Sequence, residues 1–129
     1  MRFRYKEFPR HIKRPIIPIE VCFQNECWPC EVLVDSGADH CILDAQIAEV
    51  LGIDFHRGRE GKVVGVTGVP EKIYFYPVRL KVGGWEYRTT IAFLEGLANY
   101  GHAGVVGQKG FFDKFVVKFD YLKGLIALR

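Results

Sequence analysis

Serine is almost absent from this sequence, which contains Ser36 and no other serine. A serine hydrolase would have to use that residue as its nucleophile. The residue two positions earlier is Val34 rather than the first glycine of the G-x-S-x-G turn that exposes such a nucleophile. His40 follows closely, but a catalytic triad requires a geometry that closeness in sequence does not provide. The sequence therefore does not indicate serine catalysis.

Long apolar runs are absent as well. No stretch approaches the ~20 residues that a membrane-spanning helix needs. The segment IIPIEV, which follows the basic N-terminus, is too short for the apolar core of a signal peptide. We therefore expect a cytoplasmic protein without membrane contact. The length of 129 residues fits one domain, since domains usually span about 100–200 residues.

No large excess of one charge is present: the net charge is only +3, and much of it stands in the first fourteen residues. The basic residues of this segment are Arg2, Arg4, Lys6, Arg10, Lys13 and Arg14. Such a segment can bind nucleic acid, but it is more often a solvated terminus. We expect a basic N-terminal arm over residues 1–14, a single domain over residues 15–129 and no nucleic-acid partner.

Cysteine is limited to Cys22, Cys27, Cys30 and Cys41. Cys27 and Cys30 form a C-x-x-C motif, but a zinc site usually takes a second pair of similar spacing, and the sequence has none. A thioredoxin-like motif would open a helix, whereas CWPC precedes the apolar segment EVLV. We expect no metal and no cofactor. Cys27 and Cys30 are expected to flank a hairpin turn, with or without a disulfide between them. A small cysteine-based metal or redox protein stays an alternative.

Most of the remaining sequence is typical of β-strands with a single short helix. Apolar residues recur at helical spacing over residues 43–51, with Asp44 near the start and Gly52 after the end. Gly83-Gly84 indicates a tight turn between two strands. The predicted strands cover residues 16–24, 30–34, 73–82, 85–93, 116–119 and 125–128. The sequence thus predicts a mainly β domain.

Asp35 differs from the other aspartates because it ends an apolar strand, in the stretch EVLVDSGADHC over residues 31–41. Burial of a charge without partners is costly, so a compensating environment is expected there. The turn at Ser36-Gly37 brings backbone N–H groups and a hydroxyl towards the carboxylate, and Gly37 permits a tight bend. Taken alone, DSG is typical of an ordinary Asx turn at the end of a strand.

The order of motifs around Asp35 resembles that of the retropepsin-like aspartic proteases. The most specific parts of the resemblance are Val34-Asp35-Ser36-Gly37-Ala38 and Val105-Val106-Gly107, the latter followed by Phe111-Phe112. The glycine-rich segment Gly65–Pro70 resembles the flap of that family. The resemblance runs from about Pro18 to Leu128. It implies a mainly β, closed β-barrel half-domain with one short α-helix, which assembles as a two-fold homodimer.

The activity that the resemblance implies is that of an aspartic endopeptidase. Asp35 is then the catalytic residue, one in each subunit, and the two copies share a proton and activate a water that hydrolyses a peptide bond. Ser36, Gly37 and Ala38 would support the active-site loop, with the Ser36 hydroxyl bonded across the two-fold axis. The alternative is a non-catalytic dimerisation or peptide-binding module of the same fold.

The resemblance also implies which residues contact an extended peptide or protein substrate. They are Asp39, Ile42, Val66, Thr67, Gly68, Val69 and Val105, and their apolar members predict a hydrophobic preference around the cut. The second motif departs from the family at Gln108, where an arginine is common. An ion pair with Asp39 would then be lost unless Lys109 or the basic N-terminal arm replaces it.

Overall fold

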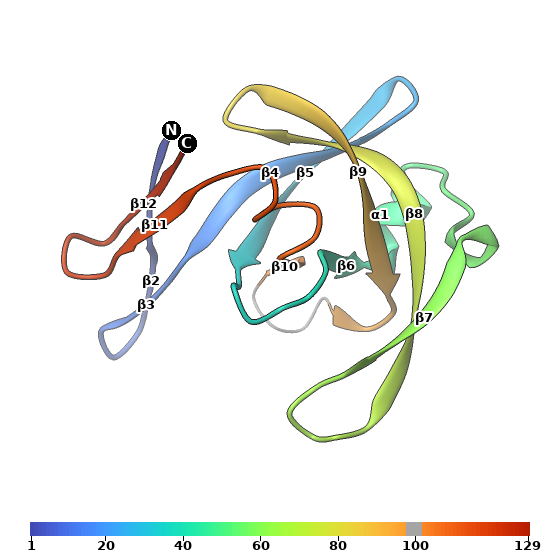
Figure 1. Cartoon of the computed structure of the whole chain (residues 1–129), viewed down its shortest axis with the longest axis horizontal. Helices are drawn as coiled ribbons and strands as arrows, with labels where there is room; N and C mark the ends of the chain where they lie inside the picture. The colour runs from blue at the N-terminus through green and yellow to red at the C-terminus, as the bar shows by residue number, and fades with distance from the viewer. Residues whose placement is uncertain (98–101) are drawn as a thin grey trace.

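The computed structural model describes residues 1–97 and 102–129, and this part of the chain is mainly β with one short α-helix (Figure 1). This confirms the mainly β prediction. In chain order the elements are β1 (Arg2–Arg4), β2 (Lys6–Phe8), β3 (Ile12–Arg14), β4 (Ile16–Phe23), β5 (Glu26–Val34), β6 (Ile42–Asp44), α1 (Ala45–Val50), the 3-10 turn η1 (Phe55–Arg57), β7 (Arg59–Val64), β8 (Pro70–Val82), β9 (Trp85–Leu94), β10 (Gly104–Val106), β11 (Val117–Asp120) and β12 (Leu125–Leu128). No helix in the described residues is long and apolar enough to cross a membrane.

The body of the molecule is a seven-stranded sheet in the order β4-β5-β10-β6-β9-β8-β7. β4 also pairs with β8. The pairings can therefore be followed from β4 through β5, β10, β6, β9 and β8 back to β4. β10 lies between β5 and β6, parallel to the first and antiparallel to the second. The connection between β5 and β6, residues 35–41, therefore passes the end of β10. This arrangement brings two distant sequence motifs together.

Two apolar clusters fill the interior. The larger one gathers side chains from both ends of the chain and includes Ile17, Leu80 and Phe111. The smaller one consists of Ile42, Ile73, Phe75, Ala92 and Leu94, with Val63, Leu97 and Val105 packed against it. Burial of apolar side chains at this density is the main favourable contribution to folding. The smaller cluster joins β6, β8 and β9, and its Phe75 contacts His40 of the 35–41 connection.

The turn between β8 and β9 is the one that the glycine pair predicts. Val82 pairs with Trp85, and Gly83 and Gly84 both have positive φ, at 56° and 86°. Left-handed backbone at both central positions matches the right-handed twist of the strands, and glycine adopts it without a steric penalty. The long β8–β9 hairpin therefore has a local origin in the sequence.

Three short strands, β1, β2 and β3, lie within the first fourteen residues. β1 pairs with β12, with Phe3 opposite Ile126, and the N-terminal amine donates to the Leu128 carbonyl over 3.1 Å. β2 and β3 form a hairpin of their own. The two termini lie side by side in Figure 1. The basic segment is thus held by pairing with the end of the chain.

The helix is shorter than the spacing of apolar residues predicts. Leu43 and Asp44 belong to β6, where Leu43 pairs with Phe93 of β9, and α1 begins only at Ala45. The Asp44 side chain accepts a hydrogen bond from the Gln46 N–H over 2.9 Å, as an N-cap does. The prediction of a helix start near Asp44 is confirmed. Its extension to residue 43 is wrong because sheet pairing prevails there.

The cysteines are arranged differently from the prediction. The hairpin turn is at Gln24-Asn25, since Phe23 pairs with Glu26, so Cys27 and Cys30 both lie within β5 and do not flank a turn. The disulfide joins Cys27 to Cys22, directly opposite on β4, with 4.0 Å between their Cα atoms. Cys30 and Cys41 carry free thiols. The register of the two strands decides this pairing.

Candidate active site

β5 ends at Val34 and delivers Asp35 to the start of the 35–41 loop. The Asp35 N–H donates to the Val106 carbonyl over 3.0 Å, which extends the pairing of β5 with β10 up to the carboxylate-bearing residue. The Val34 N–H donates to the Pro15 carbonyl on the other side over 2.8 Å. Asp35 is therefore held by backbone contacts on both sides of its strand.

The Asp35 carboxylate is bonded within its own turn. The Gly37 N–H donates to Oδ1 over 2.9 Å, and the Ala38 N–H donates to the Asp35 carbonyl over 3.2 Å. A Cβ at Gly37 would lie 3.3 Å from Oδ1, so glycine leaves room for this contact. The Asp35 side chain is half-buried and Ser36 is exposed. The turn thus presents one carboxylate with an ordered backbone donor.

The second motif, around Gly107, supports the 35–41 loop through backbone contacts. The N–H groups of Gln108 and Lys109 donate to the carbonyls of Ala38 and Asp39 over 2.8 and 2.9 Å. A Cβ at Gly107 would lie 2.4 Å from the Ala38 carbonyl oxygen and 2.6 Å from that of His40. Only glycine permits so close an approach of two backbones. The two motifs that the sequence singled out are therefore in direct contact.

Gln108 takes part in the site through an uncharged contact. Its side-chain amide donates to the Ser36 carbonyl. Asp39 is exposed, and the ion pairs formed by residues 1–97 and 102–129 do not include it. Lys109 contacts Asp39 through the backbone hydrogen bond only. Gln108 thus supports the loop directly, without the ion pair that an arginine would offer.

Cys41 closes the loop on its buried side. Its thiol donates to the Lys109 carbonyl over 3.5 Å, and its sulfur accepts from the Gly107 N–H over 3.4 Å. Burial raises the pKa of the Cys41 thiol to about 11, and burial raises that of Cys30 to about 12. Both groups are protonated near neutral pH, and the thiol form is a poor nucleophile. Cys41 therefore has a structural position beside the loop.

Of the residues expected to contact substrate, Ile42 and Val105 are brought together. They are directly opposite in the β6–β10 pairing; Ile42 belongs to the smaller apolar cluster and Val105 packs against it. Asp39 lies on the same loop as Asp35. The expected residues Val66, Thr67, Gly68 and Val69 form the tip of the β7–β8 hairpin and are exposed.

The hairpin tip is a turn closed by a hydrogen bond of 3.0 Å from the Gly68 N–H to the Gly65 carbonyl, with Gly68 at a φ of 76°. In Figure 1 the hairpin extends at the bottom of the view, beyond the rest of the chain, and the 35–41 loop faces that same side. The tip side chains do not belong to the apolar cluster that holds Ile42 and Val105. A single chain thus leaves the hairpin tip without an apolar partner among the described residues.

Sequence reasoning did not predict two contacts made by the Phe75 ring. The His40 ring packs edge-on against the Phe75 ring, with 4.9 Å between centroids, and the guanidinium carbon of Arg59 lies 4.2 Å from the centroid of the same ring. Phe75 itself belongs to the smaller apolar cluster. No local pattern announces this arrangement, because it depends on how β7, β8 and the loop are registered.

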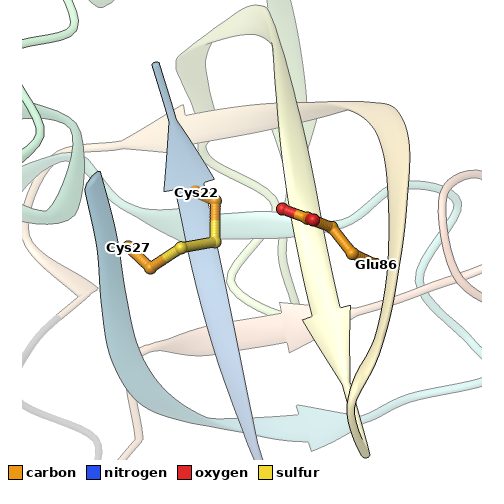
Figure 2. Close-up of side chains that lie close together, drawn as sticks. All are labelled: Cys22, Cys27 and Glu86. Atoms are coloured by element: carbon orange, nitrogen blue, oxygen red, sulfur yellow. A yellow bond between two sulfur atoms is a disulfide. The ribbon is translucent and has the colours of Figure 1, made fainter. Parts of the chain in front are cut away.

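One group of potential metal ligands lies away from the loop. Figure 2 shows Cys22 and Cys27 on adjacent strands, with Glu86 of β9 beside them. The two sulfur atoms are bonded to each other, and metal ligation by cysteine requires the free thiolate. In this oxidised state the group does not form a thiolate metal site.

Comparisons with known proteins agree with this architecture. A family model described as aspartyl protease matches residues 18–109. The chain therefore belongs to the aspartyl protease family. No curated protein sequence matches it significantly.

Two solved structures are similar to this one. A retropepsin-like aspartic protease from Rickettsia conorii shares 17% identity at a TM-score of 0.65, over 98% of this chain and 97% of that one. EIAV protease, in complex with the inhibitor HBY-793, shares 23% identity at a TM-score of 0.56, over 78% of this chain and 88% of that one. The fold is retropepsin-like.

Proposed function

We propose that the protein is an aspartic endopeptidase that acts as an obligate homodimer, with Asp35 as the catalytic residue of each subunit. The observation that carries this proposal is the position of the Asp35 carboxylate. It lies at the end of β5, bonded to the Gly37 N–H, on a loop that β10 and Gly107 brace. Membership of the aspartyl protease family supports it.

The proposed chemistry needs two carboxyl groups, and one chain supplies one DSG motif. In the dimer, Asp35 and the partner's Asp35 share one proton, because two like charges so close together are not both ionised. The ionised carboxylate takes a proton from a bound water while the water oxygen attacks the scissile carbonyl carbon, and the neutral carboxyl gives its proton to the carbonyl oxygen. The resulting diol collapses when the carboxyl that took the water proton passes it to the peptide nitrogen, one diol hydroxyl returns its proton to the other carboxylate, and the C–N bond breaks. No acyl-enzyme and no metal take part.

The other expected residues have supporting roles in this proposal. Ser36, Gly37 and Ala38 hold the loop, and the Ser36 hydroxyl, exposed in one chain, bonds across the two-fold axis. The β7–β8 hairpin is the flap, whose tip at residues 66–69 covers bound peptide. The peptide adds as an extended strand, and Ile42 and Val105 receive its apolar side chains. The pairing of β4 with β8 supports the closed barrel.

Peptide hydrolysis that depends on Asp35 tests the proposal. A complex peptide mixture is incubated with the protein over a series of buffers from acidic to neutral pH, and new termini are read by mass spectrometry. We expect new termini next to apolar residues from the wild type and none from Asp35→Asn. The matched control is Asp54→Asn, which removes an exposed carboxylate paired with Arg57.

Asp54→Asn should cut as the wild type does. Identical products from Asp35→Asn and the wild type, or no products from either, would contradict catalysis. The same fold would then be a dimerisation or peptide-binding module, in which the hydrogen-bonded DSG turn has a structural role only.

A further inference from the structure

The β7–β8 hairpin has two faces of different character. In its antiparallel pairing Arg59 is opposite Phe75 and Gly61 is opposite Ile73. Residues that are directly opposite project on the same face of the sheet. Phe75 and Ile73 belong to the apolar cluster that contains Ile42, one of the residues expected to contact substrate. Arg59 therefore lies on the inner face of the hairpin, at its base.

The outer face carries one ion pair and one further lysine. Residue 60 alternates with residue 59, so Glu60 projects outwards, and its carboxylate lies 3.4 Å from the Lys72 amine. Lys62 is on this outer face as well, directly opposite Lys72. The charges of Glu60, Lys62 and Lys72 therefore lie on the side of the hairpin opposite to Arg59.

Arg59 and His40 converge on one aromatic ring from different elements. The Arg59 guanidinium carbon lies 4.2 Å from the Phe75 ring centroid, and the His40 ring, from the 35–41 loop, lies 4.9 Å away at 75°. The ring thus fixes two basic side chains at the border between the hairpin base and the loop. The Phe75 ring is only 7% exposed, so it is buried in the apolar cluster while Arg59 and His40 contact it.

The Arg59 guanidinium has no carboxylate partner among residues 1–97 and 102–129, where the ion pairs involve other groups. An arginine stacked on an aromatic face keeps its N–H edge available for a bidentate contact with a carboxylate. Glu71 lies on the same face of the hairpin, opposite Val63 and towards the tip. The inner face is therefore basic at its base and acidic nearer its tip.

We propose that Arg59, which contacts the same Phe75 ring as His40, forms a subsite for an acidic side chain of the bound peptide. The substrate class is then a peptide whose apolar residues lie over Ile42 and Val105 and whose flanking glutamate or aspartate reaches the Arg59 guanidinium. This inference rests on the proposed function, because it assumes that the cleft beside Asp35 takes an extended peptide. It adds the charge of the substrate to the apolar preference.

Binding to the Asp35→Asn protein tests the subsite without catalysis. The probes are fluorescent peptides with one apolar centre and either glutamate or glutamine at each flanking position, measured by fluorescence polarisation. We expect the best glutamate peptide to bind about tenfold more tightly than its glutamine partner, the size typical of a hydrogen bond to a charged group. Arg59→Gln should bring this ratio close to one. Lys62→Gln removes a charge from the outer face of the same strand and should leave the ratio unchanged.

Three results would overturn the subsite: equal binding of the glutamate and glutamine peptides, the same loss of preference in Arg59→Gln and Lys62→Gln, or no binding of any peptide. Hydrolysis of the same peptides by the wild type separates the two proposals. Cleavage without an acidic preference refutes the subsite and keeps the protease. An acidic preference in binding, without Asp35-dependent cleavage, refutes the protease and keeps the subsite.

Discussion

At the scale of single residues, the position of Asp35 depends on Gly107. The two backbones approach so closely there that any side chain at Gly107 would contact the carbonyls of Ala38 and His40. Both carbonyls are backbone atoms and cannot rotate away as a side chain does. A larger residue at this position must therefore displace the 35–41 loop or β10.

We expect Gly107→Ala to lower the free energy of unfolding by about 1–3 kcal/mol, as overpacking of a tight interior does. Peptide hydrolysis should fall with it, because the loop that carries Asp35 moves. Urea unfolding and the hydrolysis assay measure both effects. Gly65→Ala is the matched control for the urea measurement alone, since a Cβ at Gly65 meets nothing within 4 Å. Equal stability of the two variants would contradict the close approach.

The free thiols lead to a prediction about chemical reactivity. Burial raises the pKa of Cys41 to about 11 and that of Cys30 to about 12, so the thiolate is scarce at neutral pH and becomes populated only as the pH rises towards these values. Iodoacetamide at about pH 7 should leave both residues unlabelled in the native protein and label both after unfolding. Mass spectrometry reads the result. Rapid labelling of native Cys41 would contradict its structural role.

At the scale of elements, the β4–β5 hairpin is closed by the Cys22–Cys27 disulfide close to its turn. The bond spans five positions in sequence, so the loop that it closes is short. A short loop has little entropy to lose in the unfolded chain, and the stabilisation is correspondingly modest. The hairpin also has its own backbone ladder and should persist after reduction.

Dithiothreitol should therefore lower the free energy of unfolding by about 2 kcal/mol and leave the fold intact. Urea titration with and without the reductant measures the change. Cys27→Ser already lacks the bond, so its unfolding should not respond to the reductant. An unchanged midpoint for the wild type on reduction would mean that the bond contributes nothing.

The elements that could be predicted from sequence have local signals. The Gly83-Gly84 turn and the Asp44 cap are specified within a few neighbouring residues. The Cys22–Cys27 pairing, the strands in residues 1–14 and the late start of α1 could not, because each depends on a partner strand. Strand register is set by long-range packing that a local pattern does not contain.

The candidate site likewise has some residues that the sequence could single out and some contacts that it could not predict. Asp35 and Gly107 could be singled out because the motifs around them resemble a known family, and the structure brings these two motifs into contact. The convergence of Arg59 and His40 on Phe75 could not be predicted, since it joins β7, β8 and the loop. This convergence depends on the pairing register of β7 and β8, and that register cannot be read from the sequence.

At the scale of the whole molecule, the account requires that two chains combine their aspartates in one site. The fold of one chain accommodates its own termini, since β1 pairs with β12 of the same chain. The exposed tip of the β7–β8 hairpin and the half-buried Asp35 are the parts that a second copy would complete. The central claim is therefore that neither subunit is active alone.

Mixing the wild type with the Asp35→Asn variant tests this claim most directly. Equal amounts are unfolded and refolded together so that subunits assort at random. Peptide hydrolysis is then compared with that of a reference sample that contains the same total amount of protein, all of it wild type. If each active unit needs Asp35 from both chains, only wild-type pairs are active and about one quarter of the activity should remain. About one half would mean that each chain works alone, and it would contradict the account.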